Sequence, residues 1–145
     1  MDRRTIYTTE IDGKEVLVYI LEGNPTPLAR PRFGQNRVFD SQKQRKINHG
    51  LALRYIHGNK PLYEGPLRLD VTFYLPAGKS FSAEQRNKLY GTPRPQRPDI
   101  DNLIKYILDA ANGVLYKDDA LIASVYADKV YDKNPRTEFT ILELT

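Results

Sequence analysis

The chain has 145 residues, enough for a single domain with a real core, and we expect residues 1–145 to form one domain. It contains no cysteine, which excludes disulfides and cysteine-ligated zinc. No apolar run approaches the roughly 20 residues of a membrane span, and no apolar signal segment follows the first residues, so we expect a cytoplasmic protein without a membrane partner.

The net charge of +4 is modest, but the charges are unevenly distributed. Between residues 30 and 46 a single acid, Asp40, faces six basic residues: Arg30, Arg32, Arg37, Lys43, Arg45 and Lys46. Between residues 99 and 119 the sign reverses, and five aspartates face only Lys105 and Lys117. Carboxylates repel phosphates, so a basic body around an acidic centre indicates that cations lie between the carboxylates and a bound polyanion.

The first half of the chain contains signals for a hairpin, a loop and a helix. Residues 15–22 are rich in β-branched residues and leucine and follow Asp12-Gly13, which predicts the second arm of a hairpin starting near Ile6. Three prolines between residues 23 and 34 predict a loop. Asp40 or Ser41 can cap a helix that runs to about residue 57, with an apolar face made of Ile47, Leu51, Leu53 and Tyr55.

The second half predicts three strands and a strongly amphipathic helix. Residues 67–75 alternate between apolar and polar, whereas residues 76–98 are mostly loop with a short helix opening near Ser82. Residues 101–112 form a helix with one apolar face and a stop at Asn112-Gly113, and residues 121–131 and 137–144 favour strands. We therefore predict an α+β fold in which two main helices cover one face of a mixed or antiparallel sheet.

The entrance of the second helix carries the chemistry. Asp99 and Asp101 flank one residue after Pro98, where the chain turns into the helix, so both carboxylates can converge on one ion. Aspartates at helix starts also serve as caps. A second acidic pair, Asp118-Asp119, favours a metal site over simple helix capping, because a returning strand could bring Asp119 back to the helix entrance.

Three convergent carboxylates would suit Mg²⁺, which prefers hard oxygen ligands and completes its shell with water and phosphate. Such a site can generate a hydroxide nucleophile. Lys105, one turn beyond Asp101, is spaced to stabilise charge that develops on a phosphate. No glycine-rich phosphate loop or Ser-His-Asp set competes for the role, and we expect no small-molecule cofactor.

The stretch RPDIDNLIK at residues 97–105, with Asn112-Gly113 and YKDDA at residues 116–120, resembles the signature of the RusA family of Holliday junction resolvases. The loop PLARPR at residues 27–32 and the C-terminal strands resemble bacterial and prophage members more loosely. By this resemblance Asp99, Asp101 and Asp119 bind the catalytic metal, and Lys105 is the essential lysine.

The resemblance implies a RusA-like crossover junction endodeoxyribonuclease of DNA recombination and repair, which uses Mg²⁺ or Mn²⁺ and resolves four-way junctions by paired symmetric nicks. It also implies a homodimer, which suits the two-fold symmetry of such a junction. The six basic residues of the first half are candidate contacts to DNA phosphates. Two alternatives stay open: a nuclease for other branched or single-stranded nucleic acid, and a non-catalytic basic DNA-binding protein whose aspartates are only caps and turns.

Overall fold

The computed structural model describes residues 5–29, 32–34, 37–39 and 41–144, and its centre is one five-stranded sheet. The strands are β1 (Tyr7–Ile11), β2 (Lys14–Glu22), β5 (Leu67–Leu75), β6 (Ile122–Tyr131) and β7 (Arg136–Glu143), in the spatial order β1-β2-β7-β5-β6. Only β5 and β6 are parallel; every other neighbouring pair is antiparallel. The sheet is therefore mixed, and the α+β prediction is confirmed.

The hairpin of β1 and β2 forms where the turn signal predicts it. Asp12 and Gly13 have φ angles of 51° and 78°, so both central residues of the turn adopt the left-handed conformation. Aspartate tolerates this conformation and glycine adopts it without strain, which explains why Asp-Gly joins two twisted antiparallel strands.

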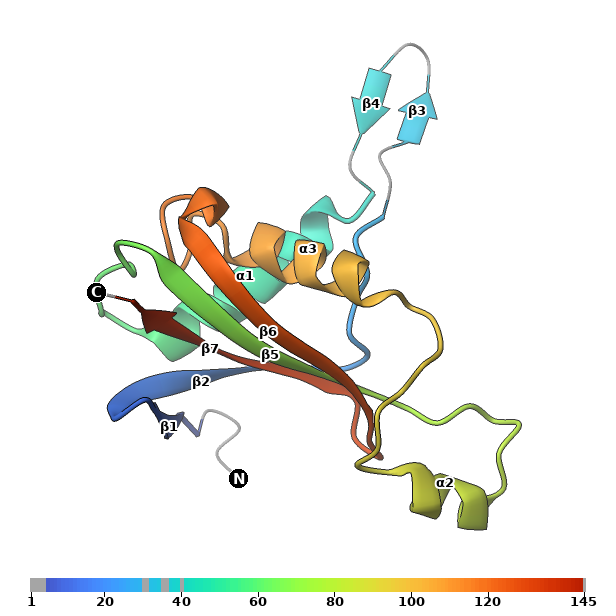
Figure 1. The fold of residues 1–145 in the computed structure, drawn as a ribbon. Helices are drawn as coiled ribbons and strands as arrows, with labels where there is room; N and C mark the ends of the chain where they lie inside the picture. Colours follow the sequence, from blue (N-terminus) through green and yellow to red (C-terminus); the bar gives the residue numbers. More distant parts are fainter. Residues whose placement is uncertain (1–4, 30–31, 35–36, 40, 145) are drawn as a thin grey trace.

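Two long helices cover one face of the sheet, as Figure 1 shows: α1 (Lys43–His57) and α3 (Ile100–Ala111). The predicted alternation of β5 is confirmed, because its five odd-numbered apolar side chains are at most 3% exposed. On the other side of the core, α3 buries Leu103, Tyr106 and Ile107. The apolar face of β5, which repeats every two residues, thus packs against the apolar face of α3, and together they form the core.

The apolar face expected for α1 is wrong for three of its four residues. Ile47, Leu51 and Tyr55 are 46%, 61% and 52% exposed, and only Leu53 is buried. The side of α1 that faces the core instead carries Gly50, Leu53 and His57. A β-carbon on Gly50 would lie 3.4 Å from the backbone oxygen of Ala110, so α1 and α3 approach each other closely at this glycine. The close approach, rather than the count of apolar residues, selects the buried side.

The remaining elements extend from this body. The short helix expected after Ser82 is α2 (Ala83–Leu89), and Ser82 and Gln85 form a reciprocal capping box at its start. Within the predicted loop the structure has β3 (Arg32–Gly34), which pairs with β4 (Arg37–Phe39). The two strands precede α1 in the chain and project away from its N-terminal end (Figure 1). Helix α1 begins after Gln42 rather than at Ser41, and the other expected cap, Asp40, lies outside the described residues.

The side chain of Gln42 explains the later start of α1. It accepts a hydrogen bond from the backbone of Ala29 and donates one to the carbonyl of Pro27, so it binds the preceding loop instead of capping the helix. Among the helices described, none is long and apolar enough to cross a membrane.

Candidate active site

Asp99 is the N-cap residue of α3, but its side chain does not cap the helix. Its backbone is extended, with φ −70° and ψ 140°, and its carbonyl accepts the first helical hydrogen bond from Leu103 at 3.2 Å. The Asp99 carboxylate makes no capping hydrogen bond, and Asp99 and Asp101 are both exposed. The capping explanation for this aspartate therefore does not hold, and its oxygens remain available to a ligand.

The outer surface of α3 continues this polar line. Asp101, Lys105 and Asp109 follow one another at four-residue intervals, and all three are exposed. Asp109 also forms an ion pair with Lys46 of α1, with 3.3 Å between nitrogen and oxygen. Lys105 thus lies midway along a stripe with carboxylates at both ends.

The second acidic pair lies at the other end of α3. Asp118 caps the short 3-10 helix η1 (Asp119–Leu121) by accepting a hydrogen bond from Ala120 at 3.0 Å, so the helix uses its carboxylate. Asp119 is half-buried, and burial together with the neighbouring carboxylates of Asp118 and Asp109 raises its pKa. This crowding of negative charge is where a cation would lower the electrostatic free energy.

The structure does not bring Asp99, Asp101 and Asp119 together within one chain. The chain turns at Gly113, whose φ is 76°, and Leu115 and Tyr116 pack into the core beside the last turn of α3. Asp119 therefore lies near Asp109, roughly 15 Å along the helix from Asp99 at a rise of 1.5 Å per residue. Across the described parts of the chain, no three histidine or acidic side chains are placed to hold a metal ion.

The residue types nonetheless fit a magnesium ion. Asp99 and Asp101 are two carboxylates one residue apart at a helix start, and Mg²⁺ typically takes one or two protein carboxylates and fills its other positions with water and phosphate. Asp119 adds a third hard oxygen donor only from the far end of α3.

Of the six predicted DNA contacts, Lys43, Arg45 and Lys46 lie at the start of α1. Arg30 and the side chains of Arg32 and Arg37 lie outside the described residues. Lys43 is exposed, whereas the Arg45 guanidinium reaches the Thr26 hydroxyl at 3.5 Å. The ammonium of Lys46 pairs with Asp109 instead of standing alone at the surface.

Three residues that the sequence patterns do not single out hold the segment before Asp99. Lys129 of β6 donates hydrogen bonds to the carbonyls of Gln96 and Pro98, at 2.6 and 2.7 Å. Arg94 donates to the carbonyl of Arg97 at 2.6 Å, and Tyr131 donates to the side chain of Gln96 at 2.5 Å. No local sequence pattern indicates the contacts of Lys129, because Gln96 and Pro98 lie more than 30 residues before it in the chain.

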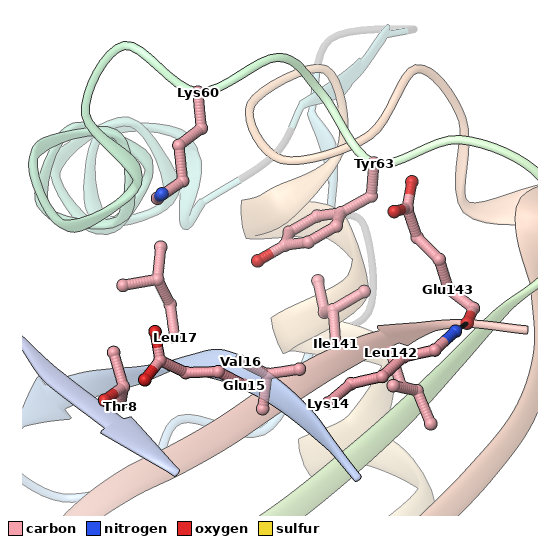
Figure 2. A pocket seen from close by; sticks show the side chains of 10 residues that line it. All are labelled: Thr8, Lys14, Glu15, Val16, Leu17, Lys60, Tyr63, Ile141, Leu142 and Glu143. Atoms are coloured by element: carbon pink, nitrogen blue, oxygen red, sulfur yellow. Dashed lines mark hydrogen bonds between the residues drawn. The ribbon is translucent and has the colours of Figure 1, made fainter. Parts of the chain in front are cut away.

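A cavity of about 200 Å³ lies elsewhere, between the ends of β2 and β7. Figure 2 shows Lys60 and Tyr63 on the loop above these strands, with Lys14, Glu15 and Glu143 around them. The ten lining residues include none of the candidate catalytic residues. The cavity combines both signs of charge, so it is not selective for phosphate.

Comparisons with known proteins agree with the resemblance in the acidic motif. The family model described as Endodeoxyribonuclease RusA matches residues 22–142, which include every candidate site residue. A Bacillus subtilis (strain 168) protein, "Uncharacterized protein YqaN", is 31% identical over 140 residues, which cover 90% of this chain and 99% of that protein. A Lactococcus phage r1t protein, "Crossover junction endodeoxyribonuclease rusA", is 36% identical over 80 residues, which cover 54% of this chain and 56% of that protein. The chain belongs to the RusA endodeoxyribonuclease family.

Proposed function

We propose that this protein is a Mg²⁺-dependent endodeoxyribonuclease that resolves Holliday junctions by paired, symmetric nicks. Membership of an endodeoxyribonuclease family supports the reaction, and the name of the phage relative supports the four-way junction as substrate. The observation that carries the proposal is that Asp99 occupies an N-cap position without capping. A non-catalytic DNA-binding protein gives no reason for an exposed carboxylate at a helix N-cap position that does not cap the helix.

In this proposal Asp99 and Asp101 bind the metal, Mg²⁺ or Mn²⁺, and Asp119 contributes a third carboxylate. The bound ion would supply an activated water and neutralise charge on the phosphate. Lys105 lies one turn beyond Asp101 on the exposed side of α3, where its ammonium can stabilise the charge that develops on the phosphate oxygens during attack.

The separation of the acidic groups favours a homodimer. A two-fold axis that passes beside the middle of α3, perpendicular to the helix, would put the N-terminal end of one α3 next to the C-terminal end of the other. Asp99 and Asp101 of each chain would then lie close to the Asp119 of the other chain, so that each of two equivalent sites would contain carboxylates from both chains. The same helical layer exposes the apolar stripe of Ile47, Leu51 and Tyr55, which gives a partner apolar area to cover.

The charge distribution supports DNA binding on the helical face. On the open face of the sheet, Arg68 pairs with Asp70 at 2.8 Å and Arg136 pairs with Glu138, so these arginines are neutralised. Lys43 and Arg45, in contrast, lie at the start of α1, and Arg30, Arg32 and Arg37 precede them in the sequence. Several phosphate contacts from this region would supply affinity through counterion release without reading sequence.

The direct experiment is incubation of the protein with a synthetic immobile four-way junction, with and without Mg²⁺, followed by mapping of the cuts. We expect metal-dependent nicks at symmetric positions on two opposing strands, and little cutting of linear duplex or single strands of the same sequence. Equal cutting of linear and branched DNA would reject the junction as the substrate, and cutting in EDTA would reject the metal.

Three substitutions test these roles, and the neighbouring residues Asp118 and Asp119 provide a matched pair among them. Asp119→Asn and Asp99→Asn should each lower the cleavage rate by at least about 100-fold, because loss even of a residue that only supports a metal ligand costs 10–100-fold. Asp118→Asn should cut nearly as fast as the wild type, since asparagine is also a good cap. Gel-shift assays should show that all three variants bind the junction, with binding unchanged or tighter because charge repulsion is relieved. Equal losses in Asp118→Asn and Asp119→Asn would contradict the assignment.

A further inference from the structure

The segment that delivers Asp99 to α3 lies along the end of the edge strand β6. Backbone hydrogen bonds join Gly91 to Tyr131 at 2.8 Å, Tyr131 to Thr92 at 3.0 Å and Arg94 to Lys129 at 3.0 Å. These bonds extend the sheet by a short irregular strand as far as Arg94. Between Arg94 and the first turn of α3, the backbone makes no further ladder bonds to β6 among those described.

Side chains take over where the ladder ends. The ammonium of Lys129 donates to the carbonyls of Gln96 and Pro98, at 2.6 and 2.7 Å, and thus spans the Arg97–Pro98 peptide. The Pro98 carbonyl belongs to the same planar peptide unit as the backbone nitrogen of Asp99. Lys129 therefore holds the peptide plane from which Asp99 begins.

The electrostatic surroundings of Lys129 connect it to the same aspartate. Lys129 is half-buried, and burial lowers its pKa, as does the neighbouring guanidinium of Arg94. The carboxylate of Asp99 is close enough to act in the opposite direction. Arg94 itself is committed to the backbone, since it donates to the carbonyls of Pro76 and Arg97 at 3.1 and 2.6 Å.

We propose that Lys129 is a positioning residue for the metal site, which fixes the backbone at Asp99 so that its carboxylate is held ready beside Asp101. This inference rests on the proposed function. A lysine suits the role because it donates several hydrogen bonds from one atom and its charge strengthens each of them. Without these donors the Pro98 carbonyl would lose the hydrogen bond from Lys129, and the Gln96 carbonyl would keep only the longer one from Arg94, at 3.3 Å. The peptide next to Asp99 would then be free to reorient.

The test replaces Lys129 by methionine, which keeps the length of the side chain and removes the donors and the charge. We expect Lys129→Met to bind Mn²⁺ about 10–100-fold more weakly in calorimetry of the DNA-free protein, the range typical for loss of a residue that orients a metal ligand. Hydrogen exchange of the amides of residues 99–103 in the metal-free protein should be faster. The Mg²⁺ concentration for half-maximal junction cleavage should rise by a similar factor, with the rate at saturating Mg²⁺ changed less.

The controls separate positioning from general stability. Lys133→Met, at an exposed lysine just after β6, should match the wild type in all three measurements. Lys129→Arg, which can still donate to both carbonyls, should recover part of the Mn²⁺ affinity. If the methionine variant does not fold, Lys129→Gln keeps one donor group and undergoes the same measurements.

Two results overturn different claims. Wild-type Mn²⁺ affinity and wild-type exchange of residues 99–103 in Lys129→Met, or in Lys129→Gln if that variant is used, would overturn the role of Lys129 and leave the nuclease intact. Full cleavage by Asp99→Asn would overturn the proposed function itself, whatever the behaviour of Lys129.

Discussion

At the scale of single residues, hydrogen bonds separate aspartates that the sequence presents as equivalent. Asp118 accepts the cap bond of η1, whereas Asp99 occupies the cap position of α3 and makes no such bond. A capping side chain stabilises a helix by typically about 1 kcal/mol, so α3 forgoes that contribution at Asp99. A carboxylate at a cap position that makes no cap hydrogen bond is consistent with the metal-binding role proposed for Asp99.

A second residue-scale feature is a buried chain of hydrogen bonds that lies apart from the proposed metal site. The Nε2 of His57 lies 2.9 Å from the carbonyl of Pro61, which can only accept, so Nε2 carries the proton. With the proton on Nε2, the Nδ1 of His57 can accept from the Tyr19 hydroxyl at 2.8 Å, and the Tyr19 hydroxyl can in turn accept from that of Tyr63 at 2.7 Å. Burial raises the pKa of Tyr19, which keeps its hydroxyl protonated as a donor.

We expect Tyr19→Phe to lower the free energy of unfolding by about 1–3 kcal/mol, because it leaves the buried Nδ1 of His57 without its donor. Urea denaturation monitored by circular dichroism measures the change. Tyr126→Phe, at a tyrosine that is 59% exposed, is the control and should change the value by less than about 0.5 kcal/mol. A similar small effect in both variants would show that the hydrogen-bond chain contributes little.

At the scale of elements, the contact between α1 and α3 determines which side of α1 is buried. Periodicity predicts α3 well because its apolar face is continuous, but α1 carries apolar residues on more than one side. The buried side contains Gly50, where the missing side chain allows the helices to meet. Helix packing thus favours a small residue at the crossing over a larger apolar stripe nearby.

Gly50→Leu should destabilise the protein by about 1–3 kcal/mol, because the added side chain must displace the backbone of Ala110 and the side chain of Val114, each 3.4 Å from the β-carbon position. Thermal unfolding provides the measurement. The matched change Ala52→Leu falls on an exposed position of the same helix and should have little effect. If Gly50→Leu is as stable as Ala52→Leu, the two helices are not tightly packed at this point.

At the scale of the whole molecule, the important feature is that the candidate carboxylates lie at opposite ends of α3. Asp99 and Asp101 lie at one end and Asp119 at the other, so in the proposed dimer each site with all three carboxylates would be shared between two chains. A four-way junction offers two symmetric strands, and a two-fold dimer would present one completed site to each.

Mixed dimers test this arrangement. Asp99→Asn and Asp119→Asn are each expected to be inactive alone. If the two variants are refolded together, some dimers contain one chain of each kind. In such a mixed dimer one shared site carries both substitutions and the other carries neither. Such mixtures should nick one strand of a junction, up to about half of the dimers being mixed if chains pair at random. If each site is built within one chain, both sites of the mixed dimer carry a lesion and no cleavage returns.

The sequence by itself determines the elements and the local part of the site. Apolar alternation specifies β5, Asp12-Gly13 specifies the first hairpin, and the spacing of Asp99, Asp101 and Lys105 places all three at one helix start. These features depend on neighbours within a few positions, so periodicity and turn chemistry are sufficient to predict them.

Only the tertiary structure decides which distant residues meet. The position of Asp119 depends on the length of α3 and on where the chain packs back before β6, and the contact of Lys129 with Pro98 depends on how residues 91–94 pair with that strand. Neither distance is encoded in local spacing, because each is set by the packing of the whole core. The motif therefore predicts a family and a chemistry, and the fold determines how its parts can be assembled.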